Sequence, residues 1–153
     1  MPPALSLQQV SDRIEINDLL IRYTTAIDTK DYSLLDTCFV PDAHLDYTSA
    51  GGIAGAYPEV RQWLEKALAP FAVTVHFISN SVVDLGSDEA KARTCVLNPM
   101  GFPNPDGSMH MFTVGAYYND ELVRTEAGWR IRKRVEESAF LEGTLPEALQ
   151  IPS

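Results

Sequence analysis

Apolar side chains recur with a helical period in the first thirty residues. They form one stripe at i, i+4, i+7 and i+11, made of Ile16, Leu20, Tyr23 and Ile27. This spacing returns to the same face of an α-helix. Ser11 is a suitable N-cap and is followed by acidic residues, which favour a helix beginning near it. The polar run 28–31 predicts its end.

Two shorter helices are predicted downstream. Ser33 can cap a helix over residues 34–39, which Pro41 would stop. Pro58 is well placed as the first residue of a third helix, and Pro70 would end it. The apolar face of that third helix comprises Val60, Trp63, Leu64, Ala67 and Leu68.

Period-two alternation predicts strands elsewhere. In segment 43–48, Ala43, Leu45 and Tyr47 share one face, and His44, Asp46 and Thr48 share the other. The glycines at 51, 52 and 55 indicate a loop. The second half of the chain reads as strands 73–84, 90–98, 109–124 and 128–137, with turns at 86–88 and 126–128 and a loop over 99–107.

This order of elements predicts an α+β fold. Helices come first and a run of long strands follows, so we expect a curved, mostly antiparallel sheet wrapped around the N-terminal helices to form a cone. A cone has an interior that can hold a ligand. The length of 153 residues fits one domain, with a core of about 8–140 and a C-terminal tail over 141–153.

Composition narrows the partners and the cellular setting. The net charge of −9 disfavours nucleic acid and anionic membranes, and no apolar run is long enough for a membrane helix. The N-terminus, Met1 to Ala4, lacks the features of a secretory signal. Cys38 and Cys95 have no metal-type spacing and are expected to be buried, reduced thiols, so we expect a cytoplasmic protein.

His76 and Asp28 are the main candidates for chemistry. His76 lies on a strand where Thr74 and Ile78 share its face. A neutral imidazole there is a candidate general base, although a core histidine bonded to a backbone carbonyl fits the same pattern. Asp28 ends the first helix, where it can instead bond its own turn, and Asp31 is expected at the surface.

The remaining polar candidates are weaker on spacing alone. Tyr23 and Tyr47 are both expected to point inward, where buried hydroxyls need partners. The three histidines form no metal-binding pattern, so we expect no metal or other cofactor. The last strand carries arginines on alternate positions, which fits a solvated face or substrate-anion binding; these are Arg130, Arg132 and Arg134.

Four segments together resemble a known group of proteins: 23–32, with its Ile27-Asp28-Thr29, then 46–49, His76-Phe77 and 128–131. They resemble the SnoaL-like group of the nuclear-transport-factor-two-like superfamily, nearest to scytalone dehydratase and bile-acid 7α-dehydratase, with hexachlorocyclohexane dehydrochlorinase as a cousin. The resemblance covers about residues 8–140. It implies the cone-shaped cystatin-like fold and a homodimer or homotrimer.

The resemblance also assigns roles to individual residues. Asp28 falls where these enzymes keep an aspartate that orients a histidine, and His76 falls on that histidine. Tyr47 matches the tyrosine that polarises the substrate carbonyl in scytalone dehydratase, and Tyr23 matches a second pocket tyrosine. We therefore expect Asp28, His76 and Tyr47 to be catalytic and Tyr23 to bind substrate.

The chain departs from the dehydratase pattern at the inner end of the pocket. Thr94 stands where scytalone dehydratase has a second catalytic histidine, and Phe112 and Val114 stand near its polar serine and asparagine. Asn98 lies near the strand carboxylate of the bile-acid enzyme. These four positions are expected to contact substrate, and their character indicates a small apolar, aromatic or polycyclic compound.

The expected activity is that of a cofactor-free lyase or isomerase. His76 would take a proton from carbon next to a carbonyl, Asp28 would orient the imidazole, and Tyr47 would bond the developing enolate. The sequence leaves dehydration and isomerisation open. Two alternatives also stay open: a polyketide-cyclase-type enzyme using the same pocket, and a non-catalytic binder of small hydrophobic ligands.

Overall fold

A computed structural model describes residues 4–145. In this range the helices are α1 (Leu7–Thr29), α2 (Tyr32–Asp36), the short 3₁₀ helix η1 (Thr48–Ala50) and α3 (Tyr57–Leu68). The strands are β1 (Phe39–Asp46), β2 (Ala54–Ala56), β3 (Val73–Thr74), β4 (Phe77–Leu85), β5 (Glu89–Pro103), β6 (Met109–Thr125) and β7 (Gly128–Glu142).

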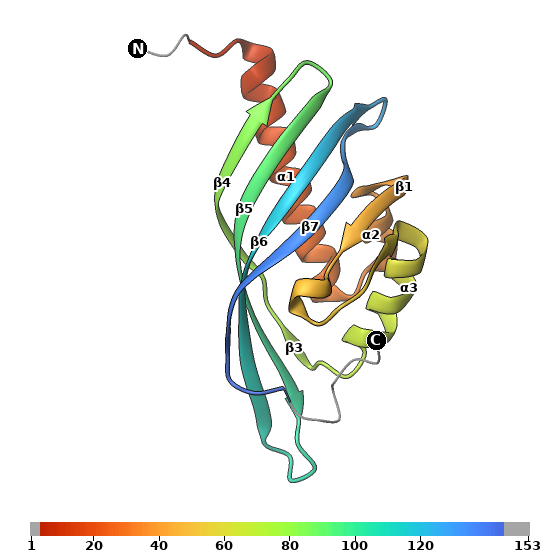
Figure 1. The fold of residues 1–153 in the computed structure, drawn as a ribbon, viewed down its shortest axis with the longest axis vertical. Coiled ribbons are helices and arrows are strands. Elements are labelled where there is room, and N and C mark those ends of the chain that lie inside the picture. The colour runs from red at the N-terminus through yellow and green to blue at the C-terminus, as the bar shows by residue number, and fades with distance from the viewer. Residues whose placement is uncertain (1–3, 146–153) are drawn as a thin grey trace.

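The seven strands form one curled sheet that makes a half-barrel. The sheet runs in the order β2-β1-β7-β6-β5-β3, and β4 pairs with the same strand, β5, as β3 does. All pairings are antiparallel except that between β1 and β7. Figure 1 shows α1 lying along the sheet, while α2 and α3 gather beside β1. The predicted cone is therefore confirmed.

Helix α1 supplies the side chains that fill this half-barrel. Its predicted stripe of Ile16, Leu20, Tyr23 and Ile27 is buried. The predicted start at Ser11 is wrong, because Ser6 and Gln9 form a reciprocal capping box that begins the helix at Leu7. At the other end, Lys30 adopts a left-handed conformation with φ of 55° and stops the helix as expected.

The segment after α1 differs from the prediction in its details. Asp31, not Ser33, caps α2, because its carboxylate accepts a hydrogen bond from the Leu34 amide at 2.9 Å. The helix ends at Asp36. Phe39 already belongs to β1, where it is the register partner of Ile131 in β7. The parallel contact with β7 thus overrides the expected helical turn over residues 34–39.

The long strands extend beyond their predicted ends. The loop expected over 99–107 is wrong in its first half, because β5 continues to Pro103 and pairs with β6 throughout. The glycine-rich loop near residue 55 contains the short strand β2, which pairs with β1. The predicted strand 73–84 is split into β3 and β4, a break that bears directly on the candidate site.

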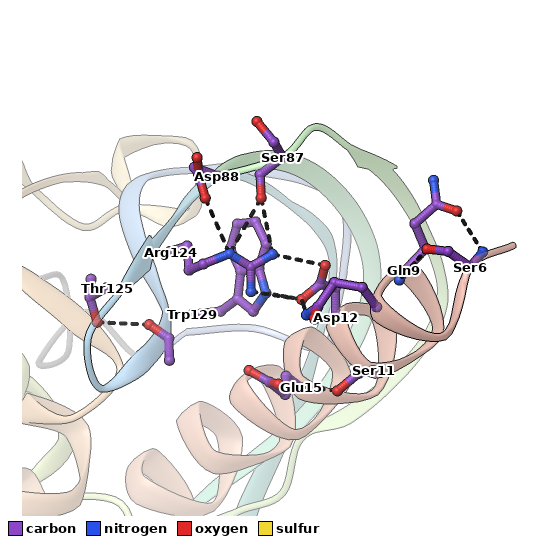
Figure 2. Close-up of polar contacts among 12 residues, drawn as sticks. Ser6, Gln9, Ser11, Asp12, Glu15, Ser87, Asp88, Arg124, Thr125 and Trp129 are labelled. Atoms are coloured by element: carbon purple, nitrogen blue, oxygen red, sulfur yellow. Dashed lines mark hydrogen bonds and ion pairs between the residues drawn. The ribbon is translucent and has the colours of Figure 1, made fainter.

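A partly buried ionic cluster ties the start of α1 to the end of the sheet near residues 87–88 and 124–129 (Figure 2). Arg124 donates two hydrogen bonds of 2.8 Å to the Asp12 carboxylate, and the Trp129 indole nitrogen donates a third at 3.1 Å. Arg124 also lies 4.6 Å above the Trp129 ring. The hydrogen bonds from Arg124 hold the pKa of Asp12 far below its ordinary value. We assign this cluster a role in stability, not in chemistry.

The remaining expectations concern the chain ends and membranes. Within residues 4–145, no helix is both long and apolar enough to cross a bilayer. The predicted tail over 141–153 starts inside β7, and its residues 146–153 lie outside the described range, as do residues 1–3 at the other end.

Candidate active site

A cavity of about 360 Å³ opens into the concave side of the half-barrel. Its walls come from α1, α3, the Ser49–Gly52 segment and strands β5, β6 and β7. The lining is mainly apolar, with Leu64, Leu68 and Phe71 on the helical side and Met100 on the sheet side. Its size falls within the range of roughly 300–1,000 Å³ that is typical of pockets for small ligands.

The Asp28 and His76 side chains hydrogen-bond each other at this cavity. His76 Nδ1 lies 2.5 Å from Asp28 Oδ1. The His76 side chain is 4 % exposed and that of Asp28 is 23 % exposed. Since a carboxylate only accepts hydrogen bonds, Nδ1 carries the proton in the neutral imidazole, and the Nε2 lone pair is left for the cavity that His76 lines.

Asp28 also explains why the strand is interrupted at His76. The His76 backbone amide donates to Asp28 Oδ2 at 2.8 Å, so it is not used in strand pairing. The Thr74 hydroxyl donates to Asp28 Oδ1 at 3.3 Å. One helix-end carboxylate therefore holds both the ring and the backbone of the histidine, and the chain leaves β3 and enters β4 around it.

Two buried tyrosines place a pair of hydroxyls on the same cavity. The Tyr23 and Tyr47 hydroxyl oxygens lie 2.8 Å apart, and both residues line the cavity. Burial raises the pKa of Tyr23 and raises that of Tyr47 well above its ordinary value. Both groups thus stay protonated, and one proton of the pair remains free to be donated to a ligand oxygen.

Arg134 supports this tyrosine pair from behind. It is fully buried and forms two hydrogen bonds of 2.7 Å with the Asp120 carboxylate. Its guanidinium lies 4.0 Å from the ring centroids of both Tyr23 and Tyr118. The expectation that Arg134 lies on a solvated face or binds a substrate anion is therefore not met, because Arg134 is paired with Asp120 inside the core.

A bulge in β7 causes this difference. Ile131 pairs with Leu122 and Lys133 pairs with Glu121, so β7 has one extra residue between these two pairs. An extra residue reverses the alternation of side chains beyond it. Arg134 therefore points inward like Ile131.

Glu136 is a cavity residue that the sequence reasoning missed. It pairs with Tyr118 across the inner face of the sheet and lines the cavity. Burial raises the pKa of Glu136 to about 7, although the nearby Arg134 acts in the opposite direction. Glu136 lies two residues after Arg134 on the same strand, so both side chains share one face. That this face points inward follows from the bulge, which the sequence pattern does not show.

The other predicted contact residues are only partly brought together. Asn98, Phe112 and Val114 line the cavity. Thr94 is buried but is not one of the lining residues, and its hydroxyl bonds that of Ser81 at 2.9 Å. Asn98 is linked to the dyad through Thr74, whose hydroxyl lies 3.5 Å from Asn98 Oδ1.

The two other histidines do not line the cavity. His44 is exposed on the outer face of the sheet, and His110 contacts the Thr144 carbonyl oxygen. Residues 4–145 contain no cluster of three or more histidine, cysteine or acidic side chains that could hold a metal ion. Both cysteines are free; Cys38 is buried, whereas Cys95 is only half-buried.

Comparison with known families agrees with this geometry. A family model described as a SnoaL-like domain matches residues 8–135. The chain belongs to the SnoaL-like domain family. This places it in the nuclear-transport-factor-two-like superfamily. Relatives from Mycobacterium tuberculosis and Mycobacterium bovis, each named as an uncharacterized protein, are 43 % identical over 136 residues, which cover 89 % of this chain and 91 % of theirs.

Solved structures share the SnoaL-like fold. A Novosphingobium aromaticivorans protein proposed to be an aromatic ring hydroxylase is 28 % identical, with a TM-score of 0.78 over 89 % of this chain and 95 % of that one. A proposed scytalone dehydratase from the same organism is 18 % identical, with a TM-score of 0.79 over 90 % and 91 %. A type 2 hexachlorocyclohexane dehydrochlorinase is 21 % identical, with a TM-score of 0.77 over 91 % and 93 %.

Proposed function

We propose that this protein is a cofactor-free lyase of the dehydratase type, or an isomerase, that acts on a small apolar carbonyl compound. The observation that carries the proposal is the 2.5 Å contact between His76 Nδ1 and Asp28 Oδ1 on the wall of an apolar cavity. Structural neighbours that are named as a dehydratase and a dehydrochlorinase support the reaction class.

The chemistry starts at His76. Its free Nε2 takes the proton from the carbon next to the substrate carbonyl, and the electrons of that bond move toward the carbonyl oxygen. Asp28 holds the imidazole in the required tautomer and stabilises the imidazolium that forms. A positioned base of this kind typically contributes about 10²–10⁴-fold to the rate.

The tyrosine pair serves the oxygen that gains charge. One hydroxyl of the Tyr23–Tyr47 pair donates to the other, which strengthens the donor that remains for the enolate oxygen. His76 then returns the proton, either to a departing hydroxyl, which completes a dehydration, or to another carbon, which completes an isomerisation. Asn98, Phe112 and Val114 bound the space in which the substrate lies.

Proton exchange tests this proposal without knowledge of the product. The protein is incubated in D₂O with a panel of apolar cyclic and aromatic ketones, and loss of the α-proton signal is followed by NMR. The wild-type protein is expected to exchange the α-protons of at least one panel member, and His76→Ala is expected to lose that exchange.

His44→Ala is the matched control, because His44 is exposed on the outer face of the sheet. Exchange that survives in His76→Ala would overturn the base assignment. Saturable binding of the ketones without any exchange would favour the alternative of a non-catalytic binder. An aldol-type ring closure would favour the polyketide-cyclase alternative.

We further propose that the protein assembles as a homodimer or homotrimer through the outer face of the sheet. Phe77 and Leu97 are register partners on that face, and they are 58 % and 40 % exposed. Other exposed apolar residues are Met109, Met111 and Phe140 of β6 and β7, and Val75 in the break between β3 and β4. Apolar surface of this kind marks association sites. Sedimentation that gives only monomer at micromolar concentration would contradict the assembly.

The cellular setting that we propose is the cytoplasm. Both cysteines are free thiols, as is usual where the surroundings are reducing. Fractionation of the source cells tests this proposal, and recovery outside the cytoplasm would contradict it.

A further inference from the structure

Among the described residues that line the cavity, Glu136 is the one acidic side chain, and the mechanism above leaves it unused. No described residue makes a hydrogen bond or ion pair with its carboxyl group. Its backbone oxygen is occupied, because it accepts from the Ser49 hydroxyl at 2.7 Å. Glu136 is half-buried, and its carboxyl group faces the cavity without a partner. A carboxyl group that is partly removed from water in this way is costly to the fold, and such groups concentrate where a ligand binds.

The nearest positive charge does not satisfy Glu136. Arg134 lies two residues away on the same face of β7, but its guanidinium is bonded to Asp120 and held between the rings of Tyr23 and Tyr118. The charge of Arg134 still disfavours a cationic ligand group next to Glu136. The other polar groups nearby are the hydroxyls of Tyr23, Tyr47 and Tyr118, which burial keeps protonated.

Strand registers separate Glu136 from the histidine base. On the β7 side, Glu136 is the register partner of Tyr118 in β6, and Tyr118 is the partner of Thr94 in β5. On the β4 side, Phe77, the residue after His76, is the partner of Leu97 in β5. His76 thus lies near the level of Asn98, four residues along β5 from Thr94. At about 3.3 Å per residue this offset is roughly 13 Å. This offset is between backbone levels, and both side chains line the same cavity, so a ligand that contacts both groups has to extend along the cavity.

We propose that Glu136 binds a hydroxyl group of the apolar ligand, at a level of the cavity distinct from that of His76. A hydroxyl both donates and accepts, so it can bond a carboxylate as well as a neutral carboxylic acid. A carbonyl group cannot bond the ionised form, and an ammonium group would face Arg134. This inference deepens the proposed function, and rests on it only in taking the occupant of the cavity to be a small apolar molecule.

Two bicyclic probes of similar shape test this recognition: 2-naphthol and 2-methylnaphthalene. Their affinities are measured by fluorescence titration of the wild-type protein, Glu136→Gln and Glu136→Leu. The wild type is expected to bind 2-naphthol about tenfold more tightly, as one hydrogen bond to a carboxyl group allows. Glu136→Leu is expected to lose this preference, and Glu136→Gln to keep part of it.

Glu137→Leu is the matched control, because Glu137 is the register partner of Tyr117 and bonds Arg93 away from the cavity. It is expected to keep the full preference. A preference for 2-naphthol that survives in Glu136→Leu would overturn the proposal, and so would a wild-type protein that binds both probes equally or neither.

The outcome is separable from that of the proton-exchange experiment. A Glu136-dependent preference without any α-proton exchange would leave hydroxyl recognition standing and remove the enzymatic mechanism. Exchange that depends on His76, combined with equal binding of the two probes, would leave the enzymatic mechanism standing and remove hydroxyl recognition by Glu136.

Discussion

Asp28 holds His76 at two points, the ring nitrogen Nδ1 at 2.5 Å and the backbone amide at 2.8 Å. The two contacts use different oxygens of one carboxylate, so the plane of Asp28 fixes the direction in which the imidazole leaves the backbone. Few rotamers of His76 are compatible with both bonds. The free nitrogen Nε2 is thereby oriented before any ligand arrives, and this preorganisation reduces the cost of reaching a reactive geometry.

The first prediction concerns the joint action of these two residues. His76→Ala is expected to reduce α-proton exchange by about 10²–10⁴-fold, because no other described base shares its position. Asp28→Asn keeps the shape but can stabilise the wrong tautomer, so it is expected to lose most of the rate. The double variant is expected to be little slower than His76→Ala. Initial rates of exchange in D₂O measure all three, and multiplicative losses would contradict a single functional unit.

The second prediction concerns the tyrosine pair. Tyr47→Phe removes one hydroxyl but leaves the base intact, so the loss is expected to be smaller than in His76→Ala. The Tyr23 and Tyr47 hydroxyls bond each other. Adding Tyr23→Phe to the Tyr47→Phe variant is therefore expected to reduce the exchange rate by a smaller factor than Tyr23→Phe does in the wild type. Exchange rates of the two single variants and the double variant measure the coupling. Fully independent effects would mean that the hydroxyls do not act on one ligand oxygen.

The third prediction concerns metals. The proposed mechanism uses only protein side chains, so exhaustive dialysis against EDTA is expected to leave the exchange rate unchanged. The matched measurement is the rate after a divalent metal is added back. A loss on chelation that the added metal restores would require a metal ligand set that residues 4–145 do not provide.

Local patterns place Asp28 and His76 on the sides of their elements that face the core, but on spacing alone each also fits a structural role, and the pairing of the two comes from the resemblance to SnoaL-like proteins. The stripe of α1 fixes the inward direction of Tyr23 and places Asp28 directly after Ile27 at the end of the helix, and the alternation around Ile78 aims His76 inward. The order of helices and strands predicts the curled sheet in the same way. These features repeat over many residues, so small errors in the element boundaries do not alter them.

Features that depend on a single irregular residue escape such patterns. The bulge between Ile131 and Lys133 turns Arg134 and Glu136 into the half-barrel, and it follows from how β7 pairs with β6. The break at His76 likewise exists because a carboxylate distant in the sequence takes one backbone amide. Thr94 was expected at the ligand, but a hydroxyl partner on the neighbouring strand occupies it. Each of these depends on long-range pairing that period-two alternation cannot reveal.

The fourth prediction concerns stability at the ionic cluster of Figure 2. Asp12→Asn is expected to destabilise the fold by about 2 kcal/mol near neutral pH, because it weakens the bonds from Arg124 and Trp129. Urea unfolding measures the effect, and Glu137→Gln at an exposed ion pair is the control, with little change expected.

The same pair of proteins gives a pH test of the cluster. The pKa of Asp12 is lowered in the folded state, so its contribution is present above the ordinary pKa of aspartate and is lost as the pH falls below it. The difference between the wild type and Asp12→Asn is therefore expected to narrow toward pH 3. An unchanged difference at low pH would contradict the assignment of the effect to the ionised carboxylate.

The last prediction uses the pKa of Glu136, which burial raises from 4.5 to about 7. A group whose pKa is raised on folding favours the folded state less as the pH rises through that value, because the unfolded chain releases its proton first. The wild-type protein is therefore expected to lose stability between pH 5 and pH 8 through this group. Glu136→Gln has no proton to release in this range. The free energy of unfolding of the variant, relative to that of the wild type, is therefore expected to rise by up to about 3 kcal/mol from pH 5 to pH 8.

Urea unfolding at pH 5 and pH 8 measures this gain for both proteins. Other titrating groups are common to the two and cancel in the comparison. Glu137→Gln is the control, because Arg93 lowers the pKa of Glu137 and places its titration below this pH range. A difference between the wild type and Glu136→Gln that stays constant from pH 5 to pH 8 would mean that the carboxyl group reaches water or a partner. In that case Glu136 would not need a ligand hydroxyl as a hydrogen-bond partner.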